Sequence, residues 1–550
     1  MKSIVKSIGL VGLWIMLHSS CNLSTQNKIE VIKERSNIVI QGSFFHGSNG
    51  LYFDDNDRLH VASVVSRYIG VVDTDTGAII DTLTTADGVE GPDDLTFGPD
   101  GSLYFTSILT GEVGRIAPDG KVSRQFVSPG TNPITFSDDG RLFVALDFQG
   151  DGLYELDPEL KNPPRLIIKE LGWLNAMDFG PDGYLYGPIW SKGQIVKIDV
   201  DNASLDIIVD DLEIPAAVKF DSKGNLYTVD HKTGMIYTID LKDGSKSEIA
   251  SGFMAGDNIA FNSEDELFIS NAQDGSIYQI NSDGSRREVI APSLCNAADV
   301  EVVNGKLIIP DILSMKSYDI DGAIDRQWYH MIGAPGIIGP FTVDAEGDHL
   351  ALTSWFGNEV QIWNIKTDKA LATYHDYAVP INAIIYKGAL IVAELGTSQG
   401  GAKVSRRNNG NIETLLDAKG GLVVPSGLAC DKGNCYVADF YRGVVFQITE
   451  NGDKMTAAKV LLEGLIQPEG LQIGPKGRLI IVETGANKVS AYDLNTNEIS
   501  SLVDNIALGL EGPKGVPPTW KFSDVHFDSD GVLYVPSDVD NVVYKYDGVF

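Results

Sequence analysis

Short stretches of alternating apolar and polar residues occur in pairs along the chain, and a tight turn rich in Gly and Asp separates the members of each pair. Residues 95–105, Leu-Thr-Phe-Gly-Pro-Asp-Gly-Ser-Leu-Tyr-Phe, are the clearest example, and residues 218–229, 471–482 and 525–535 repeat the pattern. Alternation with a period of two predicts half-buried strands, and such turns predict antiparallel hairpins. No stretch keeps a helical period over several turns, so we expect almost no helix.

Each hairpin belongs to a larger unit that recurs about every 40 residues, and the chain contains twelve such units. In the second unit, strand signals cover residues 94–97, 103–106, 113–117 and 122–127. Four strands per unit at a fixed period are typical of β-propellers, so the predicted fold is all-β with four-stranded antiparallel blades. The residues that close the first strands are Phe53, Phe97, Phe136, Phe179, Phe220, Phe261, Val302, Val343, Ile385, Cys430, Ile473 and Phe527.

Twelve blades can close as two rings of six or as one ring of twelve. We predict two tandem six-bladed propellers, over residues 36–284 and 285–550, because a ring of twelve would leave a wide channel with little to fill it. Propellers commonly close by pairing strands from the chain ends, which removes an open edge. In this arrangement residues 37–41 complete the sixth blade, and residues 285–291, the outer strand of that unit, complete the twelfth. The alternative is one twelve-bladed ring closed directly by residues 37–41.

The N-terminus has the pattern of a secretory signal over residues 1–21. Lys2 and Lys6 precede an apolar run over residues 8–17, which is too short to span a membrane. The ending Ser-Ser-Cys21 resembles a bacterial lipoprotein signal, which implies lipidation of Cys21, although His18 stands where leucine is usual and ordinary cleavage stays open. Residues 22–35 would form a polar tether. We expect an exported lipoprotein of the outer membrane or cell surface, or otherwise a periplasmic protein.

The composition limits the classes of partner that the protein is expected to bind. The chain has 43 Lys and Arg against 75 Asp and Glu, a formal net charge of −32, which disfavours nucleic acid and leaves membrane contact only to the N-terminal lipid. Cys430 and Cys435 flank a predicted turn, where a disulfide is feasible in an oxidising compartment. Cys295 is expected to be a buried thiol.

Polar residues recur at one register of the first six units. In an antiparallel blade this position, four residues before the closing apolar residue, lies beside the central channel. A circle of carboxylate and amide oxygens around one axis suits Ca²⁺ or another divalent cation, whereas the alternative is that each side chain bonds local backbone and shapes a turn. The first six units carry Asn49, Asp93, Asn132, Asn175, Ala216 and Asp257, and the last six carry Ala298, Gly339, Ile381, Ser426, Glu469 and Ser523.

The ends of the second strands should lie at the same face. In the second half these positions are acidic, which suits a cation, a basic partner or simple solubility. The residues are Ser63, Ser107, Asp147, Asp230, His231 and Asn271 in the first half and Asp311, Glu394, Asp439 and Glu483 in the second.

Residues 48–53, Ser-Asn-Gly-Leu-Tyr-Phe, and the blade at 91–105 resemble the gluconolactonase, senescence marker protein and paraoxonase-like family of six-bladed propellers. Their repeats are related in style to those of the NHL and streptogramin lyase propellers. In that family Glu, Asn and Asp at this register hold a divalent metal, and an acidic ligand acts as base in lactone hydrolysis. The family's Glu has no counterpart here, since Glu90 lies three residues too early. By position, the resemblance implies metal ligation by Asn49, Asp93, Asn132, Asn175 and Asp257.

The expected function is that of a cell-envelope protein with a divalent cation in the first channel, hydrolysing a small lactone or related ester. Asp93 or Asp257 would deprotonate water, and His231 would shuttle a proton near neutral pH. Two alternatives remain: a non-catalytic module that binds a glycan, peptide or protein, and a metal-dependent lyase like the streptogramin lyases. An enzyme needs a substrate-sized opening beside the metal. Residues 508–521 form a long loop expected to cover a channel mouth or to wedge between the rings.

Overall fold

The computed structural model describes residues 37–329, 337–396, 401–512 and 518–549. Within these ranges the chain is all-β, and its only helices are five 3₁₀ segments of three residues each, at Thr85–Asp87, Trp190–Lys192, Ala418–Gly420, Pro475–Gly477 and Thr484–Ala486. In the part of the chain so described, none of the helices has the length and apolarity needed to cross a membrane. The predicted signal over residues 1–21, the lipidation of Cys21 and the tether lie outside the described residues.

Twelve four-stranded antiparallel sheets form the molecule, as the repeat predicts. Each of the first six sheets is built from four consecutive strands, with the first strand innermost. The six blades are β2 (Leu51–Phe53), β3 (Leu59–Ser63), β4 (Tyr68–Asp73) and β5 (Ala78–Leu83); β6 (Pro92–Phe97), β7 (Leu103–Ser107), β8 (Glu112–Ile116) and β9 (Val122–Phe126); β10 (Thr131–Phe136), β11 (Leu142–Leu146), β12 (Gly152–Leu156) and β13 (Arg165–Lys169); β14 (Asp178–Phe179), β15 (Leu185–Ile189), β16 (Gln194–Asp199) and β17 (Ser204–Val209); β18 (Pro215–Phe220), β19 (Leu226–Asp230), β20 (Met235–Ile239) and β21 (Lys246–Ala250); and β22 (Gly256–Phe261), β23 (Leu267–Asn271), β24 (Ile277–Ile280) and β25 (Arg286–Ile290).

The last six sheets follow the same order except for the outer strand of the twelfth. These blades are β26 (Glu301–Val303), β27 (Lys306–Pro310), β28 (Ser314–Asp319) and β29 (Ile324–Tyr329); β30 (Val343–Glu346), β31 (His349–Ser354), β32 (Glu359–Asn364) and β33 (Lys369–Tyr374); β34 (Pro380–Tyr386), β35 (Ala389–Glu394), β36 (Lys403–Asn408) and β37 (Asn411–Asp417); β38 (Pro425–Asp431), β39 (Asn434–Asp439), β40 (Val444–Glu450) and β41 (Asp453–Glu463); β42 (Pro468–Gly474), β43 (Arg478–Glu483), β44 (Lys488–Asp493) and β45 (Ile499–Asp504); and β46 (His526–Phe527), β47 (Leu533–Ser537), β48 (Val542–Tyr546) and β1 (Ile38–Gln41).

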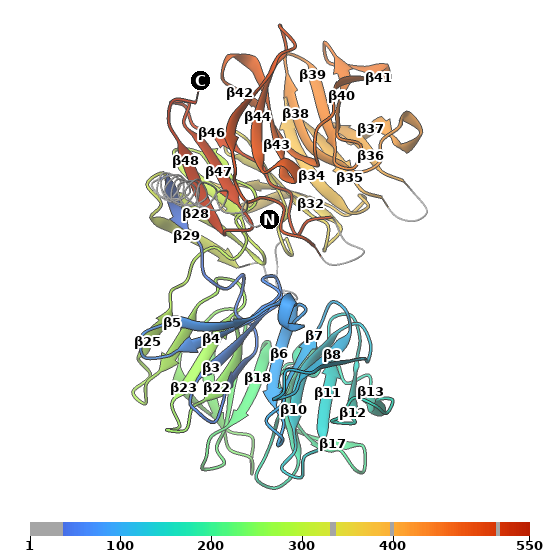
Figure 1. The fold of residues 1–550 in the computed structure, drawn as a ribbon. Coiled ribbons are helices and arrows are strands. Elements are labelled where there is room, and N and C mark those ends of the chain that lie inside the picture. Colours follow the sequence, from blue (N-terminus) through green and yellow to red (C-terminus); the bar gives the residue numbers. More distant parts are fainter. Residues whose placement is uncertain (1–36, 330–336, 397–400, 513–517, 550) are drawn as a thin grey trace, which may run out of the picture.

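The blades close into two rings of six, which form the two lobes in Figure 1. The first blade contacts the sixth, since β2 packs beside β22 and the Ser270 hydroxyl donates to the Asn49 carbonyl at 2.6 Å. The seventh blade likewise contacts the twelfth, where the Asp524 N–H donates to the Ala298 carbonyl at 2.9 Å. These contacts confirm two six-bladed propellers rather than one ring of twelve.

The predicted exchange of outer strands between the rings is wrong. Strand β1 pairs antiparallel with β48, with Ile40 opposite Val543, and so completes the twelfth blade. Strand β25, which follows Gly284, remains the outer strand of its own sixth blade. Residues 38–41 therefore belong to the second propeller, and the chain crosses to the first propeller and back. Strand β1 pairs with the otherwise open edge of β48, and β25 pairs with the edge of β24, so each blade has four strands.

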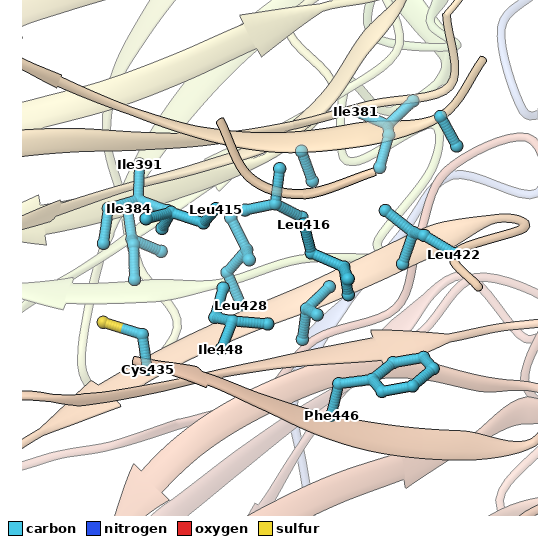
Figure 2. Packing of buried hydrophobic residues seen from close by; sticks show 14 of the residues in the cluster. Ile381, Ile384, Ile391, Leu415, Leu416, Leu422, Leu428, Cys435, Phe446 and Ile448 are labelled. Atoms are coloured by element: carbon cyan, nitrogen blue, oxygen red, sulfur yellow. The ribbon is translucent and has the colours of Figure 1, made fainter. Parts of the chain in front are cut away.

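Apolar side chains fill the spaces between neighbouring blades. Figure 2 shows one such cluster, in which Ile384 and Ile391 of the ninth blade meet Leu428 and Ile448 of the tenth. All four side chains are buried because successive blades pack face to face and exclude water from both inner surfaces. The outer strands alternate exposed and half-buried positions, as in β9, because only one of their faces meets a neighbour.

The cysteines occupy the predicted positions. Cys430 and Cys435 are directly opposite one another in the hairpin of β38 and β39 and form a disulfide with a Cα–Cα distance of 4.1 Å. Cys295 is a buried free thiol, and its burial raises its pKa well above the ordinary value. The thiol is therefore protonated at neutral pH and acts as a structural residue.

Candidate functional site

An irregularity in the inner hairpins places the predicted oxygen-bearing residues in the first channel. The pairing of β6 with β7 shifts between Pro92 and Leu95, and that of β22 with β23 shifts between Gly256 and Ile259. A bulge of this kind leaves the intervening residues unpaired and re-aims their side chains. Asp93 and Asp257 lie inside these shifts, and Asn132 lies in the corresponding shift of β10.

Side-chain hydrogen bonds join these residues across neighbouring blades. The Asn49 amide of the first blade donates to the Asp257 carboxylate of the sixth at 3.2 Å. The Asn132 amide donates to the Asn175 oxygen of the next blade at 3.4 Å and to Asp147 at 2.7 Å. The structure therefore brings four of the predicted residues together in two hydrogen-bonded groups at one end of the channel. The fifth, Asp93, is close enough to Asp257 and Asp147 for their charges to raise its pKa.

Three carboxyl groups in this region, those of Asp93, Asp94 and Asp147, are buried. Burial, with a further contribution from Asp257, Asp147 and Asp94, raises the pKa of Asp93 well above its usual range. Burial raises the pKa of Asp257 to about 7, against the opposing hydrogen bond from Asn49. Hydrogen bonds from Asn49 and Asn132, and the charge of Lys219 near Asp94, offset only part of this effect of burial.

Asp147 is a further member of the group that the register analysis did not include. It is fully buried at the end of β11, one of its oxygens accepts from Asn132, and its Oδ1 has no hydrogen-bond partner among the described residues. The corresponding Asp230 and Asp439 instead accept backbone N–H groups from the loop that precedes their own blade, at Glu213 and Val423. Asp147 thus departs from a structural role that its counterparts keep.

The predicted acidic rim of the second propeller follows this structural pattern. Asp311 accepts the N–H groups of Cys295 and Asn296, Glu394 accepts that of Ala378, and Glu483 accepts that of Ile466. These contacts tie the second strand of each blade to the segment entering it. The local hydrogen bonds account for acidic residues at these positions without a ligand.

The oxygen atoms at this end of the first channel are of the type that binds a hard cation, but some of them already accept backbone hydrogen bonds. The Asn49 and Asn175 oxygens already accept the backbone N–H groups of Val64 and Ala176, at 3.4 Å and 2.8 Å. Among the residues described, no three Asp, Glu, His or Cys side chains converge closely enough to hold a metal ion. A cation here would therefore need amide oxygens beside its carboxylates, which is the composition of the predicted set with its two acids.

A cavity of about 290 Å³ lies between the propellers at this end of the channel. From the first propeller it is lined by Asn49 and Asp93, and from the second by a group of aromatic side chains. A mostly apolar cavity with a few convergent polar groups is the usual form of a small-molecule site. The aromatic residues are Phe148 of the first propeller and Phe341, Trp355, Phe356 and Trp520 of the second.

The loop predicted as a lid or wedge lies between the propellers. Glu511 forms an ion pair at 3.0 Å with Arg67 of the first propeller, and Trp520 and Lys521 line the cavity. Within the second propeller, the Gly509 and Leu510 N–H groups donate to the Asp538 carboxylate, which anchors the start of the loop. The described parts of this loop therefore act as a wedge that also forms part of the cavity wall.

His231 is not one of the residues that line the cavity, and Trp190 lies between it and the lining residue Phe148. Its Nδ1 contacts the Gly256 carbonyl at 3.0 Å, and its ring packs against Trp190 with centroids 4.8 Å apart. Burial lowers its pKa to about 4, so the ring is neutral near pH 7. This environment is that of a packed neutral histidine and does not suit a shuttle that titrates near neutrality.

No protein-family model and no curated protein sequence matches the chain. Among solved structures, selenomethionine-substituted virginiamycin B lyase from Staphylococcus aureus shares 15% identity at a TM-score of 0.37, covering 58% of this chain and 94% of the lyase. The extracellular domain of BT3049 from B. thetaiotaomicron, assigned to the hybrid two-component systems, shares 13% identity at a TM-score of 0.32, over 92% and 82% of the two chains. The twelve blades make this chain a β-propeller protein. At these scores the neighbours carry no functional argument.

Proposed function

We propose that the protein is an exported hydrolase of a small lactone or related ester, with a divalent cation, Ca²⁺ by donor type, in the first channel. One observation carries this proposal: Asn49 and Asp93 belong both to the oxygen-bearing end of the channel and to the lining of the cavity between the propellers. A ligand in the cavity would therefore contact the polar channel at one end and aromatic side chains elsewhere.

The residues that would hold the cation are Asn49, Asp93, Asn132, Asn175 and Asp257, and the unpartnered oxygen of Asp147 is a sixth donor. Each offers a hard oxygen, the ligand type that Ca²⁺ prefers. When bound, the cation would polarise the ester carbonyl.

The chain's own groups supply the remaining steps. The aromatic side chains would exclude water from the apolar part of the substrate and hold the reacting group near Asp93. Asp93 would accept a proton from the attacking water and return it to the leaving alcohol, with Asp257 beside it as the second carboxylate. The proposed mechanism assigns no proton transfer to His231, because its Nδ1 is held by a backbone carbonyl and its ring packs against Trp190.

The second candidate is a small-molecule binding protein without catalysis. The favouring observation is that Asp93 is the single carboxyl group of the cavity lining within the described residues, so the described lining holds no second carboxylate to act beside it. The aromatic wall would then supply most of the affinity, and a polar group of the ligand would bind at the channel.

A panel of lactones and carboxylic esters, with and without chelator, separates the two candidates. We expect the purified protein to hydrolyse at least one lactone, chelator to abolish the activity, and Asp93→Asn to lower kcat/KM at least a hundredfold. Asp206→Asn, at an exposed site on β17, is the matched control and should leave the rate unchanged. Tight binding of panel members without turnover would support the binding protein instead.

A further inference from the structure

Lys521 is a buried lysine that forms no ion pair with a carboxylate of the described residues, and it lines the cavity between the propellers. Its side chain is 2% exposed. The Nζ donates to the backbone carbonyls of Pro310 and Asp311, the latter at 3.1 Å. A buried ammonium normally requires an ion pair, because carbonyl groups compensate only part of its lost hydration.

The two hydrogen bonds match the donor count of a neutral amine. An uncharged –NH₂ group has two N–H donors and one lone pair, whereas an ammonium has three donors and no lone pair. With both N–H groups donated to Pro310 and Asp311, the lone pair of the neutral form is left free of these contacts. A third proton would have no partner in the described structure.

The charged groups around Lys521 do not reverse the preference for the neutral amine. The Asp311 carboxylate is bound by the ammonium group of Lys316 in a fully buried ion pair. The Asp299 carboxylate accepts the Val343 N–H at 2.7 Å. Burial lowers the pKa of Lys521 to about 7, an effect that Lys316 reinforces and that Asp311 and Asp299 oppose.

We infer that Lys521 is a nucleophilic amine of the cavity, which captures an aldehyde or ketone of apolar character as a Schiff base. A neutral, desolvated lysine is the form that attacks carbonyl carbon. The Nζ lone pair forms the C–N bond, the carbonyl oxygen takes up one proton from the amine and one from solvent water, and loss of that oxygen as water breaks the C–O bond and leaves the protonated imine. No oxidation or reduction occurs. The cavity's aromatic side chains, Trp355 and Phe341 among them, would hold the apolar part of the ligand.

This site differs from the proposed hydrolytic one in its residues and its chemistry. The hydrolase proposal depends on Asp93 and the oxygen donors of the first channel, whereas carbonyl capture depends on an amine that the second propeller supplies. Either one can fail without the other.

Reductive trapping tests the inference on the unmodified protein. The protein is incubated at pH 7 with butanal or benzaldehyde and sodium cyanoborohydride, and the modified lysines are quantified by peptide mass spectrometry. We expect Lys521 to be alkylated at least tenfold faster than Lys161 and Lys432, which are exposed. Lys316, buried and ion-paired, should remain unmodified and serves as the internal control.

The pH dependence supplies a second readout that needs no variant. Labelling of Lys521 should approach a plateau above pH 8, while labelling of exposed lysines should keep rising. Lys521→Arg should lose the trapped adduct and keep the wild-type labelling of the exposed Lys161 and Lys432. Labelling of Lys521 no faster than that of Lys161, across pH 6 to 9 and with both aldehydes, would overturn the inference.

Discussion

The Asn49 amide and the Asp257 carboxylate meet at 3.2 Å although they belong to the first and the sixth blade of one propeller. The contact forms where the ring closes, so it depends on the whole six-bladed ring rather than on one hairpin. It also places an amide and an acid beside Asp93 at the mouth of the cavity. Ring closure and the candidate site are therefore linked by the same residues.

Ile40→Ala tests closure of the second propeller by the N-terminal strand. Ile40 is 3% exposed on β1 and packs with Tyr534 and Val543 of the twelfth blade. Removing its side chain should lower the free energy of unfolding of the second propeller by about 2–4 kcal/mol, because the cavity left behind refills only partly. The control is Ile324→Ala at a site 54% exposed on β29, where we expect less than about 1 kcal/mol. Urea denaturation followed by circular dichroism measures both, and equal effects would contradict closure by β1.

Lys316→Met tests the junction between the propellers. The Lys316 Nζ pairs with Asp311 and donates to the Gln273 and Ser293 carbonyls at 2.9 Å, with Gln273 in the first propeller. Its loss leaves the Asp311 charge buried and unpaired, which should cost about 3–5 kcal/mol. The same substitution at Lys306, whose ion pairs on the same blade are partly exposed, should cost far less because solvent screens those pairs. A shift in melting temperature for Lys316→Met no larger than that for Lys306→Met would contradict this assignment.

Arg67→Ala tests the ion pair between the first propeller and the loop over residues 508–521. Arg67 pairs with Glu90 in its own propeller and with Glu511 in the loop. Because Glu511 is largely exposed, global stability should change by less than about 1 kcal/mol, while hydrogen exchange at residues 508–512 should become faster. Arg58→Ala removes an ion pair with Asp54 far from the loop in sequence and should leave that exchange unchanged. Unaltered hydrogen exchange in Arg67→Ala would show that this ion pair does not hold the loop.

Much of the architecture could be predicted from the sequence because blade hairpins are local. Turns and strand alternation depend on residues that are close in sequence, and so does the repeat length. The twelve sheets and the cysteine hairpin could therefore be predicted from the sequence. The pairing partner of residues 37–41 could not be predicted, because each ring offers an open strand edge and the alternating pattern fits both edges. The choice follows from packing of Ile40 against Tyr534, a contact between the two ends of the chain.

The candidate site was predictable in part for the same reason. The register of Asn49, Asp93 and Asp257 is a local property, and the bulges that expose it follow Pro92 and Gly256. Asp147 was predicted at the channel rim but not among the metal ligands, because it lies outside the register of the first-strand residues. Only its hydrogen bonds distinguish it from its structural counterparts at the ends of other second strands. The contribution of the second propeller to the cavity depends on how the two rings pack, which no repeat pattern encodes.

Glu469→Gln tests the effect of pH on the second propeller. Burial first, and then the charge of Asp538, raises the pKa of Glu469 to about 8. A carboxyl whose folded pKa is raised contributes its full stability below the unfolded value near 4.5 and loses that contribution as pH rises toward 8. The wild type should therefore lose stability over this window. The glutamine mimics the protonated acid, since it can donate to Thr519 and accept from the Ser523 N–H.

At pH 8 Glu469→Gln should be more stable than the wild type by on the order of 2 kcal/mol, and at pH 4.5 the two should be equal. Other buried acids of this propeller, such as Asp299 and Asp344 with pKa values of about 7, will leave a residual slope. Glu498→Gln, at an exposed site, is the control and should retain the wild-type pH profile. A profile for Glu469→Gln parallel to that of the wild type would contradict the raised pKa.

Metal content is the most direct test of the proposed site in the first channel. The purified protein, dialysed against Ca²⁺ and then against metal-free buffer, is analysed by mass spectrometry of its elements beside the Asp93→Asn/Asp257→Asn and Asp206→Asn/Asp210→Asn variants. Each double variant replaces two carboxyl groups with amides, but Asp206 and Asp210 are exposed and distant in sequence from the channel register. We predict about one cation per chain in the wild type and the surface variant, and none in the channel variant. Equal metal content in all three proteins, or none in any, would contradict the account.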